Sequence, residues 1–425
     1  MSVPYAPPPH PTLTPPPMLT STTPGTWAHD TMSRRIEADI LARLEEENSE
    51  ELSSSQFTAA AAKVASLRKE IQESTVIRPV EGPNDPDIAD WDSLVSSLPP
   101  STTYLTAPWL TAEFYVYRRV LEAFDYFNPS SPTHKFDPFV KQKRAGLLSS
   151  VSSAEALLGR IVKLKKNDSG LQVALLSALW GNKMDLSIWP ADSDGSVDVF
   201  TSIVENAANN LLWDDTPTLI PSMLASSPCS VHIIVDNAGF ELVTDLALAD
   251  YLVASGVAST VTFQLKGHPT FVSDAMESDL LETVDHFSKL ADSHLNCAAA
   301  GERWSKYLTE GKWICREDYY WCQPFPMWKM SDKATSSLKD ADYCFVKGDA
   351  NYRRLLGDCA WDYVNDSFQD VVGSYFPCNV VALRTLKAEV GCGMKKDLME
   401  AAAVADSNWQ VNGNWGVVQF GSPEK

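Results

Sequence analysis

Two hydrophobic patterns divide the chain. Between about residues 30 and 170, apolar residues recur at helical spacing with charged residues between them, most clearly in 29–48, 56–74 and 109–127. After about residue 225, short β-branched and apolar runs alternate with helix-like segments. These runs are 231–236, 259–266, 341–349 and 378–387. The first pattern predicts a helical lobe, and the second predicts a sheet whose strands are connected by helices.

The run at 231–236 is followed by a helix expected over 240–256, and then by the run at 259–266. A strand, a helix and a strand in this order predict two parallel strands with a right-handed crossover. The later runs repeat the order. The C-terminal half is therefore predicted to be α/β, with a mainly parallel sheet.

Composition narrows the partners and the setting. The chain has 425 residues and a net charge of -20, which argues against nucleic acid or an anionic membrane as a partner. It contains no run of 18 apolar residues, so no membrane span is expected. Its eight cysteines form no C-x-x-C pair and predict reduced, mostly buried thiols. These features indicate a cytoplasmic setting, with a nuclear one also open.

The organisation predicted from these patterns has three parts. Residues 1–26 are rich in proline and should form a mobile, extended tail. Residues 27–170 should form the helical lobe, and residues 171–425 the α/β domain.

Polar side chains follow four of the predicted strands, and open parallel sheets bind ligands at the carboxyl ends of their strands. Burying such groups without partners would cost roughly 2–7 kcal/mol each, so they need an occupant. The residues concerned are Asp236, Asn237, Lys266, Asp274, Lys347, Asp349, Asn351 and Lys387.

The chemistry of these groups indicates a metal and a phosphate. Asp236, Asn237 and Asp274 offer hard oxygen donors, which suit Mg²⁺ or Mn²⁺. The neighbouring lysines and Arg353 suit a phosphate, and a helix starting near Asn351 would add backbone N–H groups. A metal-bound phosphate ester would use both halves.

Simpler interpretations stay open for several of these residues. The Asp236–Asn237 pair could form only a turn, and Glu241 with Asp245 could form only a solvated helix face. His268 is expected to be a loop histidine, and the aromatic segment 313–328 is expected to serve core and lid packing. The joint position at strand ends favours the metal and phosphate interpretation.

Five motifs in order resemble a known family. They are LWGNKMDLS at 179–187, VDNAGFEL at 235–242, FVSDA at 271–275, VKGDANYRRLLGD at 346–358 and LRTLK at 383–387. Together they resemble the metal-dependent damage-control phosphatases, in the subgroup marked by an Arg-Thr-x-Lys motif. Some members of that subgroup also carry the name protein-glutamate O-methyltransferase. The resemblance covers about residues 27–393.

This resemblance implies a three-layer α/β/α sandwich with an N-terminal helical lobe. It implies one divalent metal, Mn, Ni, Co or Mg, held by Asp236, Asn237 and Asp274. It also implies hydrolysis of small phosphate esters, typically hexose phosphates such as fructose 1-phosphate or fructose 6-phosphate. The expected catalytic residues are Asp236, Asn237, Glu241 and Asp274. The expected substrate contacts are Arg35, Glu113, Asn182, Lys347, Asp349, Asn351, Tyr352, Arg353 and Lys387.

Two questions of mechanism and three rival functions stay open at this point. Either a water or Asp236 itself could attack the phosphorus, and Glu241 could orient or deprotonate the water. The rivals are an S-adenosylmethionine-dependent methyltransferase, a sugar-phosphate sensor and a scaffold recruited through the proline-rich segment. The acidic DNAGFE loop at 236–241, which has no G-x-G pattern, argues against the methyltransferase.

Overall fold

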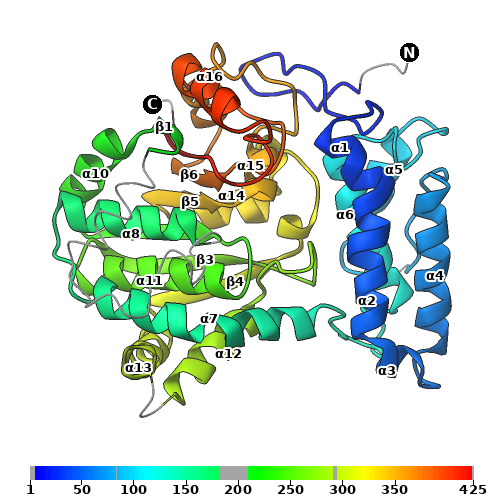
Figure 1. The fold of residues 1–425 in the computed structure, drawn as a ribbon, viewed down its shortest axis with the longest axis horizontal. Coiled ribbons are helices and arrows are strands. Elements are labelled where there is room, and N and C mark those ends of the chain that lie inside the picture. Colours follow the sequence, from blue (N-terminus) through cyan, green and yellow to red (C-terminus); the bar gives the residue numbers. More distant parts are fainter. Residues whose placement is uncertain (1–4, 83, 182–208, 291–293, 424–425) are drawn as a thin grey trace.

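A seven-stranded sheet forms the centre of the larger part of the molecule (Figure 1). The structure is a computed structural model, and it describes residues 5–82, 84–181, 209–290 and 294–423. The strand order is β1-β7-β6-β5-β2-β3-β4. The strands are β1 (Leu211–Asp214), β2 (Cys229–Ile234), β3 (Ala258–Lys266), β4 (Trp313–Asp318), β5 (Tyr343–Lys347), β6 (Asn379–Thr385) and β7 (Gly416–Gly421).

The strands β4, β3, β2, β5 and β6 pair in parallel, and β7 pairs antiparallel to β6. The predicted mainly parallel sheet is therefore confirmed. From β2 the chain continues to β3 and β4 on one side of the sheet, and then crosses to β5 on the other side of β2. The switch point of the sheet therefore lies between β2 and β5. In open α/β sheets the crevice at such a switch point is the usual ligand site.

Side chains along each strand alternate between two hydrophobic cores. Val231 and Ile233 pack into one core, whereas Ile234 packs into the other with Cys344 and Val346. This alternation gives a helix layer on each face and confirms the three-layer sandwich. One layer contains α7 (Val140–Ile161), α8 (Asp168–Trp180), α10 (Thr216–Ala225), α11 (Phe240–Ala254), α12 (Glu277–Ser288) and α13 (Leu295–Thr309). The other contains α14 (Asp332–Lys339), α15 (Asp349–Leu355) and α16 (Lys396–Ala405).

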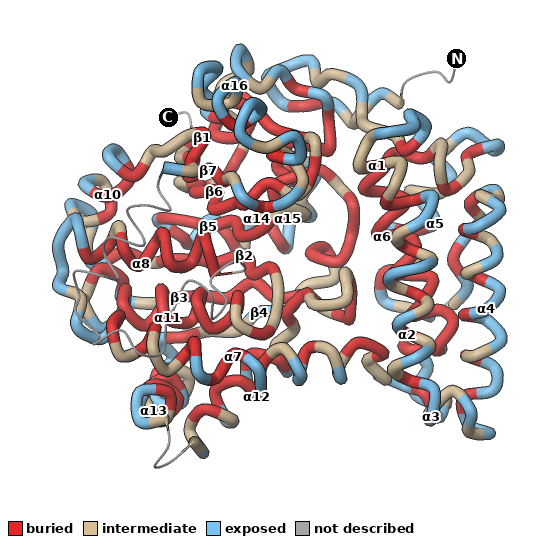
Figure 2. The backbone as a smooth tube through the Cα atoms, viewed as in Figure 1, coloured by how far each residue is buried: buried red, intermediate tan, exposed pale blue. Residues whose placement is uncertain are grey.

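The helical lobe stands beside the sheet with a core of its own (Figure 1). Its central helix α6 is buried along its whole length, while the outer helices show alternating exposed stretches (Figure 2). The lobe contains α1 (Trp27–Asp30), the π-helix η1 (Thr31–Leu41), α2 (Ala42–Glu47), α3 (Ser49–Leu52), α4 (Thr58–Gln72), α5 (Ile88–Ser97) and α6 (Trp109–Ala123). Short helical segments elsewhere are η2 (Tyr319–Cys322), η3 (Met327–Lys329) and η4 (Gln369–Gly373).

One predicted boundary, the end of the helical lobe, differs from the structure. α7 falls within the range predicted for the lobe, but it packs against α11 and, together with α8, shares the core of the sheet domain. The lobe therefore ends near Phe139, not at residue 170. Within the aromatic segment 313–328, residues 313–318 form the edge strand β4, and Trp313 and Trp321 are buried in the two cores, which confirms the expected core packing.

The proline-rich segment is not a mobile tail over its described part. Residues 5–26, here called the N-terminal strap, lie against both regions. The His10 imidazole is buried, donates from Nε2 to the Val371 carbonyl at 3.0 Å, and meets the Trp328 ring edge-on at 5.0 Å. Leu19 donates its N–H to the Asp358 carbonyl at 2.9 Å and accepts from the Trp109 N–H at 2.8 Å. Proline makes this segment extended, but these anchors fix it in place.

Two further expectations from the sequence concern reduced, mostly buried thiols and the lack of a membrane-spanning helix. All eight cysteines are free, and every one except Cys315 is buried. Across the described part of the chain, none of the helices combines the length and the apolar character needed to traverse a bilayer.

Candidate active site

The loops that follow β2 and β3 are bound to each other by their backbones. Ala238 donates its N–H to the Ser273 carbonyl at 2.7 Å, and Ala275 donates its N–H to the Asp236 carbonyl at 2.8 Å. These bonds place Asn237 opposite Asp274 as an isolated antiparallel bridge. The structure therefore brings together the three residues that the sequence placed at separate strand ends.

The carboxylates of Asp236, Glu241 and Asp274 together carry more negative charge than the nearby lysines neutralise. Burial, with Glu241 and Asp274 close by, raises the pKa of Asp236 well above its usual range. Burial also raises the pKa of Asp274, although Lys266 opposes that shift. The amide Nδ2 of Asn237 donates to Asp236 and to Glu241, at 2.9 Å in each case. Within the described ranges, neither Asp236 nor Glu241 forms an ion pair.

Lys266, at the end of β3, is the cation that pairs with Asp274. Its Nζ lies 3.0 Å from Asp274 Oδ2. The two atoms are within ion-pair distance but are poorly aligned for a hydrogen bond, so Oδ2 keeps free acceptor capacity although Asp274 is only 1% exposed. A buried acceptor of this kind suits a cation at the mouth of the site.

The donor set fits a hard divalent metal. Asp236 and Asp274 supply carboxylate oxygens, and the Asn237 Oδ1 accepts from Ser273 Oγ at 2.7 Å, which leaves one lone pair for a metal. In the parts of the chain that are described, no set of three or more His, Cys, Asp or Glu side chains is arranged to hold a metal. A metal here would therefore depend on the Asn237 amide oxygen as its third protein donor.

The end of β5 approaches this group closely. A Cβ atom added at Gly348 would lie only 1.9 Å from Asp236 Oδ2, and Gly348 has a φ of +83°. Both facts require glycine at this position. Asp349, the next residue, accepts from the backbone N–H of Lys387 at 3.0 Å and from Arg384 Nε at 2.8 Å. Arg384 is fully buried, so it fixes the loop that carries Lys387 and does not itself face the cavity.

The lobe supplies the opposite wall. The Glu113 carboxylate on α6 pairs with Arg353 Nη1 at 2.5 Å. Arg353 also binds Asp358 with two nitrogens, at 2.7 and 3.1 Å, and its guanidinium stacks on Trp109 at 3.6 Å. Burial raises the pKa of Glu113, although Arg353 opposes that shift. The Arg353 charge is thus largely committed to holding the lobe against the sheet domain.

The η1 helix brings a less constrained cation to the cavity. The guanidinium of Arg35 lies 4.2 Å from the centroid of the Trp27 ring, and its one ion pair among the described residues is a long contact of 3.8 Å with Asp39. π-helical turns are rare and often occur at functional sites, and Thr31 and Arg35 both come from this one.

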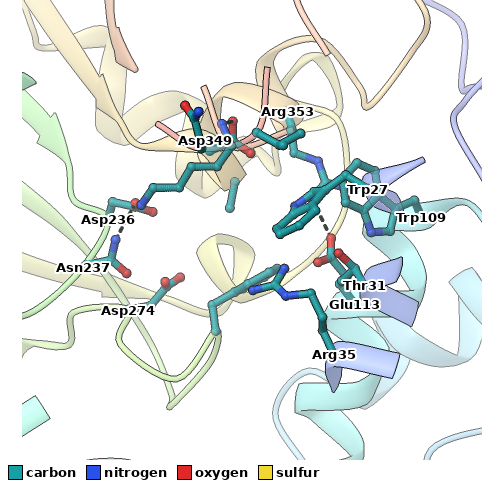
Figure 3. Close-up of a pocket in the computed structure, with 15 residues that line it drawn as sticks. Trp27, Thr31, Arg35, Trp109, Glu113, Asp236, Asn237, Asp274, Asp349 and Arg353 are labelled. Carbon is teal, nitrogen blue, oxygen red and sulfur yellow. Dashed lines mark hydrogen bonds and ion pairs between the residues drawn. The ribbon is translucent and has the colours of Figure 1, made fainter. Parts of the chain in front are cut away.

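These elements enclose a cavity of about 330 Å³ (Figure 3). In Figure 3 the Asp236, Asn237 and Asp274 side chains approach from the sheet side, while Trp27, Trp109, Glu113 and Arg35 approach from the lobe. The lining residues are Trp27, Thr31, Arg35, Trp109, Glu113, Asp236, Asn237, Phe271, Asp274, Asp349, Ala350, Arg353, Lys387, Val411 and Asn412.

Most of the predicted site residues therefore share one cavity, but three expected substrate contacts do not line it. Lys347 is 1% exposed, and its Nζ pairs with Asp245 at 2.7 Å and donates to the Ala178 carbonyl. Asn351 donates to the backbone carbonyls of Val235 and Lys347, at 3.2 and 2.9 Å.

Tyr352 is the third of these, and its hydroxyl donates to Gln419 at 2.6 Å. These three predictions of direct contact are corrected: the side chains turn into the core and fix α15 on the sheet. Glu241 also lies outside the lining set and contacts Asn237 instead. Asn182 lies outside the described residues.

The sequence did not single out Trp27, Thr31, Trp109 or Asn412 as site residues. Trp109 and Glu113 are four apart on one helix and so share a face, which is a usable sequence signal. Trp27 and Thr31 have the same spacing. Asn412 lies in a loop whose glycines and asparagines indicate only turns, and nothing local marks it as part of a cavity.

The fold and the cavity define an α/β/α enzyme with an oxygen-donor site at the switch point of its sheet. The sequence matches the model of the family described as "Damage-control phosphatase ARMT1-like domain" over residues 31–401. The chain belongs to this family and is a phosphatase of it.

Two vertebrate relatives agree with this family assignment. The damage-control phosphatase ARMT1 of Danio rerio is 34% identical over 343 residues, which cover 76% of this chain and 75% of that protein. The damage-control phosphatase ARMT1 of Homo sapiens is 31% identical over 391 residues, covering 85% and 86%. A crystal structure of a DUF89 family protein from Pyrococcus horikoshii aligns with a TM-score of 0.42 and 17% identity, over 83% of this chain and 92% of that one.

Proposed function

We propose that this chain hydrolyses phosphate monoesters of small sugars in the cavity between the sheet and the lobe. The observation that carries the proposal is the excess of buried negative charge at Asp236 and Asp274, at the switch point of the sheet. Such an excess is stabilised when a cation binds there, and Lys387 on the same cavity provides a positive side chain for an anionic substrate.

The proposed cation is one divalent metal, Mg²⁺, Mn²⁺, Co²⁺ or Ni²⁺, held by Asp236, Asn237 and Asp274. When bound, such a metal polarises the phosphoryl oxygens and lowers the charge that must develop during the reaction. Glu241 accepts one hydrogen of the Asn237 amide and so keeps the Oδ1 atom of that amide directed away from itself. Its role in this proposal is to position Asn237.

The remaining residues bind and orient the ester. The ammonium group of Lys387 offsets charge on the equatorial phosphoryl oxygens, and the Arg384–Asp349 contact holds the loop that presents it. Either a water or the Asp236 carboxylate attacks the phosphorus, and the two routes differ in whether a phospho-enzyme forms. Trapping with a slow substrate followed by mass spectrometry of residues 231–241 separates them.

The size and chemistry of the cavity favour a hexose phosphate, such as fructose 1-phosphate or fructose 6-phosphate. A volume of about 330 Å³ is at the low end for small-molecule sites. Glu113, held by Arg353, offers a carboxylate to sugar hydroxyls, and Trp27 offers an aromatic face. The lobe thus selects the sugar portion of the ester.

The test is a phosphatase screen with the full chain. Fructose 1-phosphate, fructose 6-phosphate, glucose 6-phosphate and p-nitrophenyl phosphate are each assayed with Mg²⁺, Mn²⁺, Co²⁺ and Ni²⁺ in turn, and with EDTA. We expect metal-dependent phosphate release, with a hexose phosphate preferred over the aryl ester in kcat/KM. Turnover that is unaffected by EDTA would overturn the metal proposal, and no turnover of any ester would overturn the function.

Glu113→Gln sharpens the substrate assignment. We expect this variant to change the ranking among the hexose phosphates while hydrolysis of p-nitrophenyl phosphate stays within about threefold, because the aryl ring reaches less far toward α6. Glu81, an exposed glutamate of the lobe, is the control when changed to Gln. Equal losses on the aryl ester and the sugar phosphates would contradict selection by the lobe.

A further inference from the structure

A second cavity adjoins the proposed active site and is not used by the reaction described above. Its volume is about 440 Å³, and it shares Trp27 and Val411 with the active-site cavity. Three chain segments line both cavities: residues 25–31, 387–389 and 407–412.

The two cavities are neighbours because residues close together on the same segment line one cavity and then the other. Lys387 lines the active-site cavity and Glu389 lines the second one, while Ala388 between them is buried in the core of the lobe. The loop at 407–412 likewise places Asn412 in the first cavity and Gln410 in the second. A ligand bound at Lys387 would therefore lie beside the second cavity.

The chemistry of the second cavity differs from that of the first. Its wall carries the Trp27 indole, the carboxylates of Asp30 and Glu389, and the amides of Asn408 and Gln410. No lysine or arginine lines it among the described residues. The site therefore has nothing to offer a second phosphate, but it has acceptors and donors for neutral hydroxyl groups.

The state of the polar groups supports a neutral, hydroxyl-rich occupant. The Glu389 carboxylate is half-buried and accepts the Trp27 N–H with one oxygen, at 3.2 Å. The His29 Nδ1 donates to the Ser21 carbonyl at 2.8 Å, so in the neutral ring Nε2 remains an acceptor. An aromatic face beside hydroxyl-binding amides and carboxylates is the composition expected of a sugar-binding surface.

We propose that the second cavity is a subsite for a further sugar ring of the substrate, so that the enzyme accepts phosphorylated disaccharides as well as hexose phosphates. This inference rests on the proposed function and extends it from the phosphorylated ring to the ring attached to it. Trp27 lies at the junction, where its indole contacts both rings.

The experiment compares matched pairs of esters with the metal-loaded full chain. One pair is glucose 6-phosphate and trehalose 6-phosphate, and the other is fructose 6-phosphate and the sucrose phosphate that carries its phosphate on C6 of the fructose ring. In each pair the second ester differs by one added neutral ring. We expect at least one disaccharide phosphate to be hydrolysed with a kcat/KM no lower than that of its monosaccharide partner.

The double variant N408A/Q410A removes both amides from the second cavity and leaves the residues of the first unchanged. We expect it to lower kcat/KM for the disaccharide phosphate about 10-fold, while that for the monosaccharide phosphate and for p-nitrophenyl phosphate stays within about twofold. Gln56→Ala, at an exposed position of the lobe, is the matched control and should change none of these values.

Two outcomes overturn the subsite. One is exclusion of the added ring, with both disaccharide phosphates below about a hundredth of their partners in kcat/KM. The other is a variant that affects both members of a pair equally. Calorimetric titration of the same four esters decides the question without turnover, since the disaccharide should bind more tightly and lose that gain in the variant. Absence of all hydrolysis would count against the proposed function, whereas the binding ratio would still test the subsite.

Discussion

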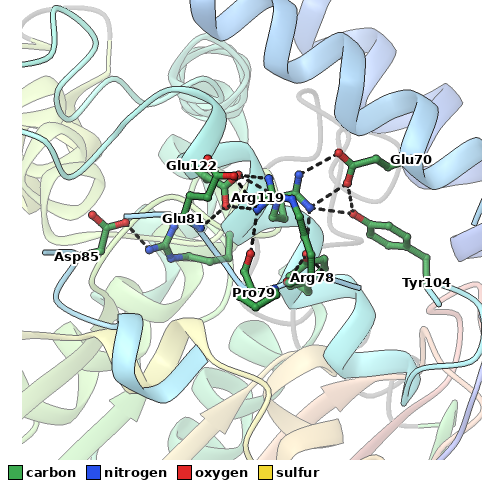
Figure 4. Close-up of polar contacts among 10 residues, drawn as sticks. Glu70, Arg78, Pro79, Glu81, Asp85, Tyr104, Arg119 and Glu122 are labelled. Carbon is green, nitrogen blue, oxygen red and sulfur yellow. Dashed lines mark hydrogen bonds and ion pairs between the residues drawn. The ribbon is translucent and has the colours of Figure 1, made fainter. Parts of the chain in front are cut away.

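Two buried clusters of charge, one in the lobe and one at the strand ends, are built in opposite ways. In the lobe each buried carboxylate meets an arginine: Arg119 pairs with Glu70 and Glu122, and Arg78 also pairs with Glu122 (Figure 4). The Tyr104 hydroxyl donates to Glu70 at 3.2 Å. This cluster neutralises its own charge and holds α6 to the chain around it.

A second part of the lobe follows the same rule. Arg118 is fully buried and binds Asp87 with two nitrogens, at 2.9 and 3.0 Å, and Asp85 at 2.6 Å. Asp87 also accepts from Trp91 Nε1 at 3.0 Å. Such a network is structural, because both aspartates are paired with Arg118 inside the lobe and neither lines the active-site cavity.

The strand-end cluster leaves its charge unmatched. Asp236 and Glu241 share the single amide of Asn237, and Asp274 has one poorly aligned lysine. The comparison teaches that buried carboxylates alone do not mark a site. What distinguishes the site is that, over the described residues, neither Asp236 nor Asp274 pairs with an arginine, whereas Glu113 and Asp349 on the same cavity each do.

The largest expected effect on folding comes from breaking the neutral cluster. Arg118→Met would leave Asp87 buried without its partner and should lower the free energy of unfolding by about 3–5 kcal/mol, as measured by urea denaturation. Adding Asp87→Asn should recover part of that loss, because it removes the stranded charge. Arg43→Met, which disrupts an exposed pair with Glu47, is the control and should cost less than about 1 kcal/mol. A loss as small as the control's would refute the structural role.

Asp274→Asn should impair activity and metal binding but not stability, in contrast to Arg118→Met. We expect kcat/KM for sugar phosphates to fall about 10²- to 10³-fold, equivalent to about 2.7–4 kcal/mol, and bound metal to be lost, as measured by elemental analysis. The unfolding free energy should not fall, since a repulsive charge has been removed. Asp285→Asn, on an exposed helix face, should keep both activity and metal. Full metal content in Asp274→Asn would exclude Asp274 as a ligand.

Lys387→Met tests the positive side of the cavity. A charge-assisted hydrogen bond contributes about 1.5–3 kcal/mol, so kcat/KM should fall about 10- to 100-fold with little change in stability. The loop should stay in place, because Asp349 binds the backbone N–H of Lys387 and not its side chain. Lys396→Met, at an exposed lysine, serves as the control. Unchanged kinetics would show that the phosphate binds elsewhere.

The pH dependence of stability should reveal the unmatched charge. The pKa of Asp236 is raised in the folded protein, so the fold favours its protonated form. Its contribution to stability is therefore fully present below the unfolded pKa, near 3.8, and is lost as the pH rises through the folded pKa. In EDTA, Asp236→Asn should thus stabilise the protein at pH 8 and have a smaller effect at pH 5, as measured by urea denaturation. The same gain at both pH values would contradict an ionised, unneutralised Asp236.

The smallest expected effect concerns the strap that spans the two regions. His10→Ala removes a buried ring that accepts the backbone N–H groups of Thr12 and Leu13 at Nδ1 and donates to Val371. It should lower the unfolding free energy by about 1 kcal/mol and increase hydrogen exchange at Leu19 and Trp109. His134→Ala, at an exposed histidine, should do neither. Unchanged exchange at Leu19 would mean that the rest of the strap docks without His10.

The sequence was sufficient for the strand-end site because each strand there shows a local signal. An apolar run that ends in Asp236–Asn237, and another that leads to Asp274, predict polar groups at one edge, and the structure brings them together. The orientation of Lys347 was not predictable in the same way. It lies one residue before the Gly348 turn, and its side chain turns into the core because Asp245 on α11 and the Ala178 carbonyl on α8 lie there, both far away in the sequence.

Packing partners were the other part that local patterns could not supply. The amphipathic pattern of α7 is the same whether it packs on the lobe or on the sheet, so its assignment to the lobe had no local test. β1 has only four residues, and the antiparallel direction of β7 depends on its neighbours in the sheet. The proline content of the strap predicted its extension, but the aromatic pocket for His10 comes from residues more than 300 positions away.

That separation affects how the molecule can assemble as it leaves the ribosome. The strap is made before the residues that anchor it: Leu19 bonds to Asp358, and His10 bonds to Val371, 361 positions later. The lobe helices, whose contacts are local, can pack while translation continues, but the strap stays solvated and extended until residues 358–371 have emerged. The strap is therefore synthesised before the lobe but docks after it, and its docking joins the N-terminal end of α6 to the sheet domain.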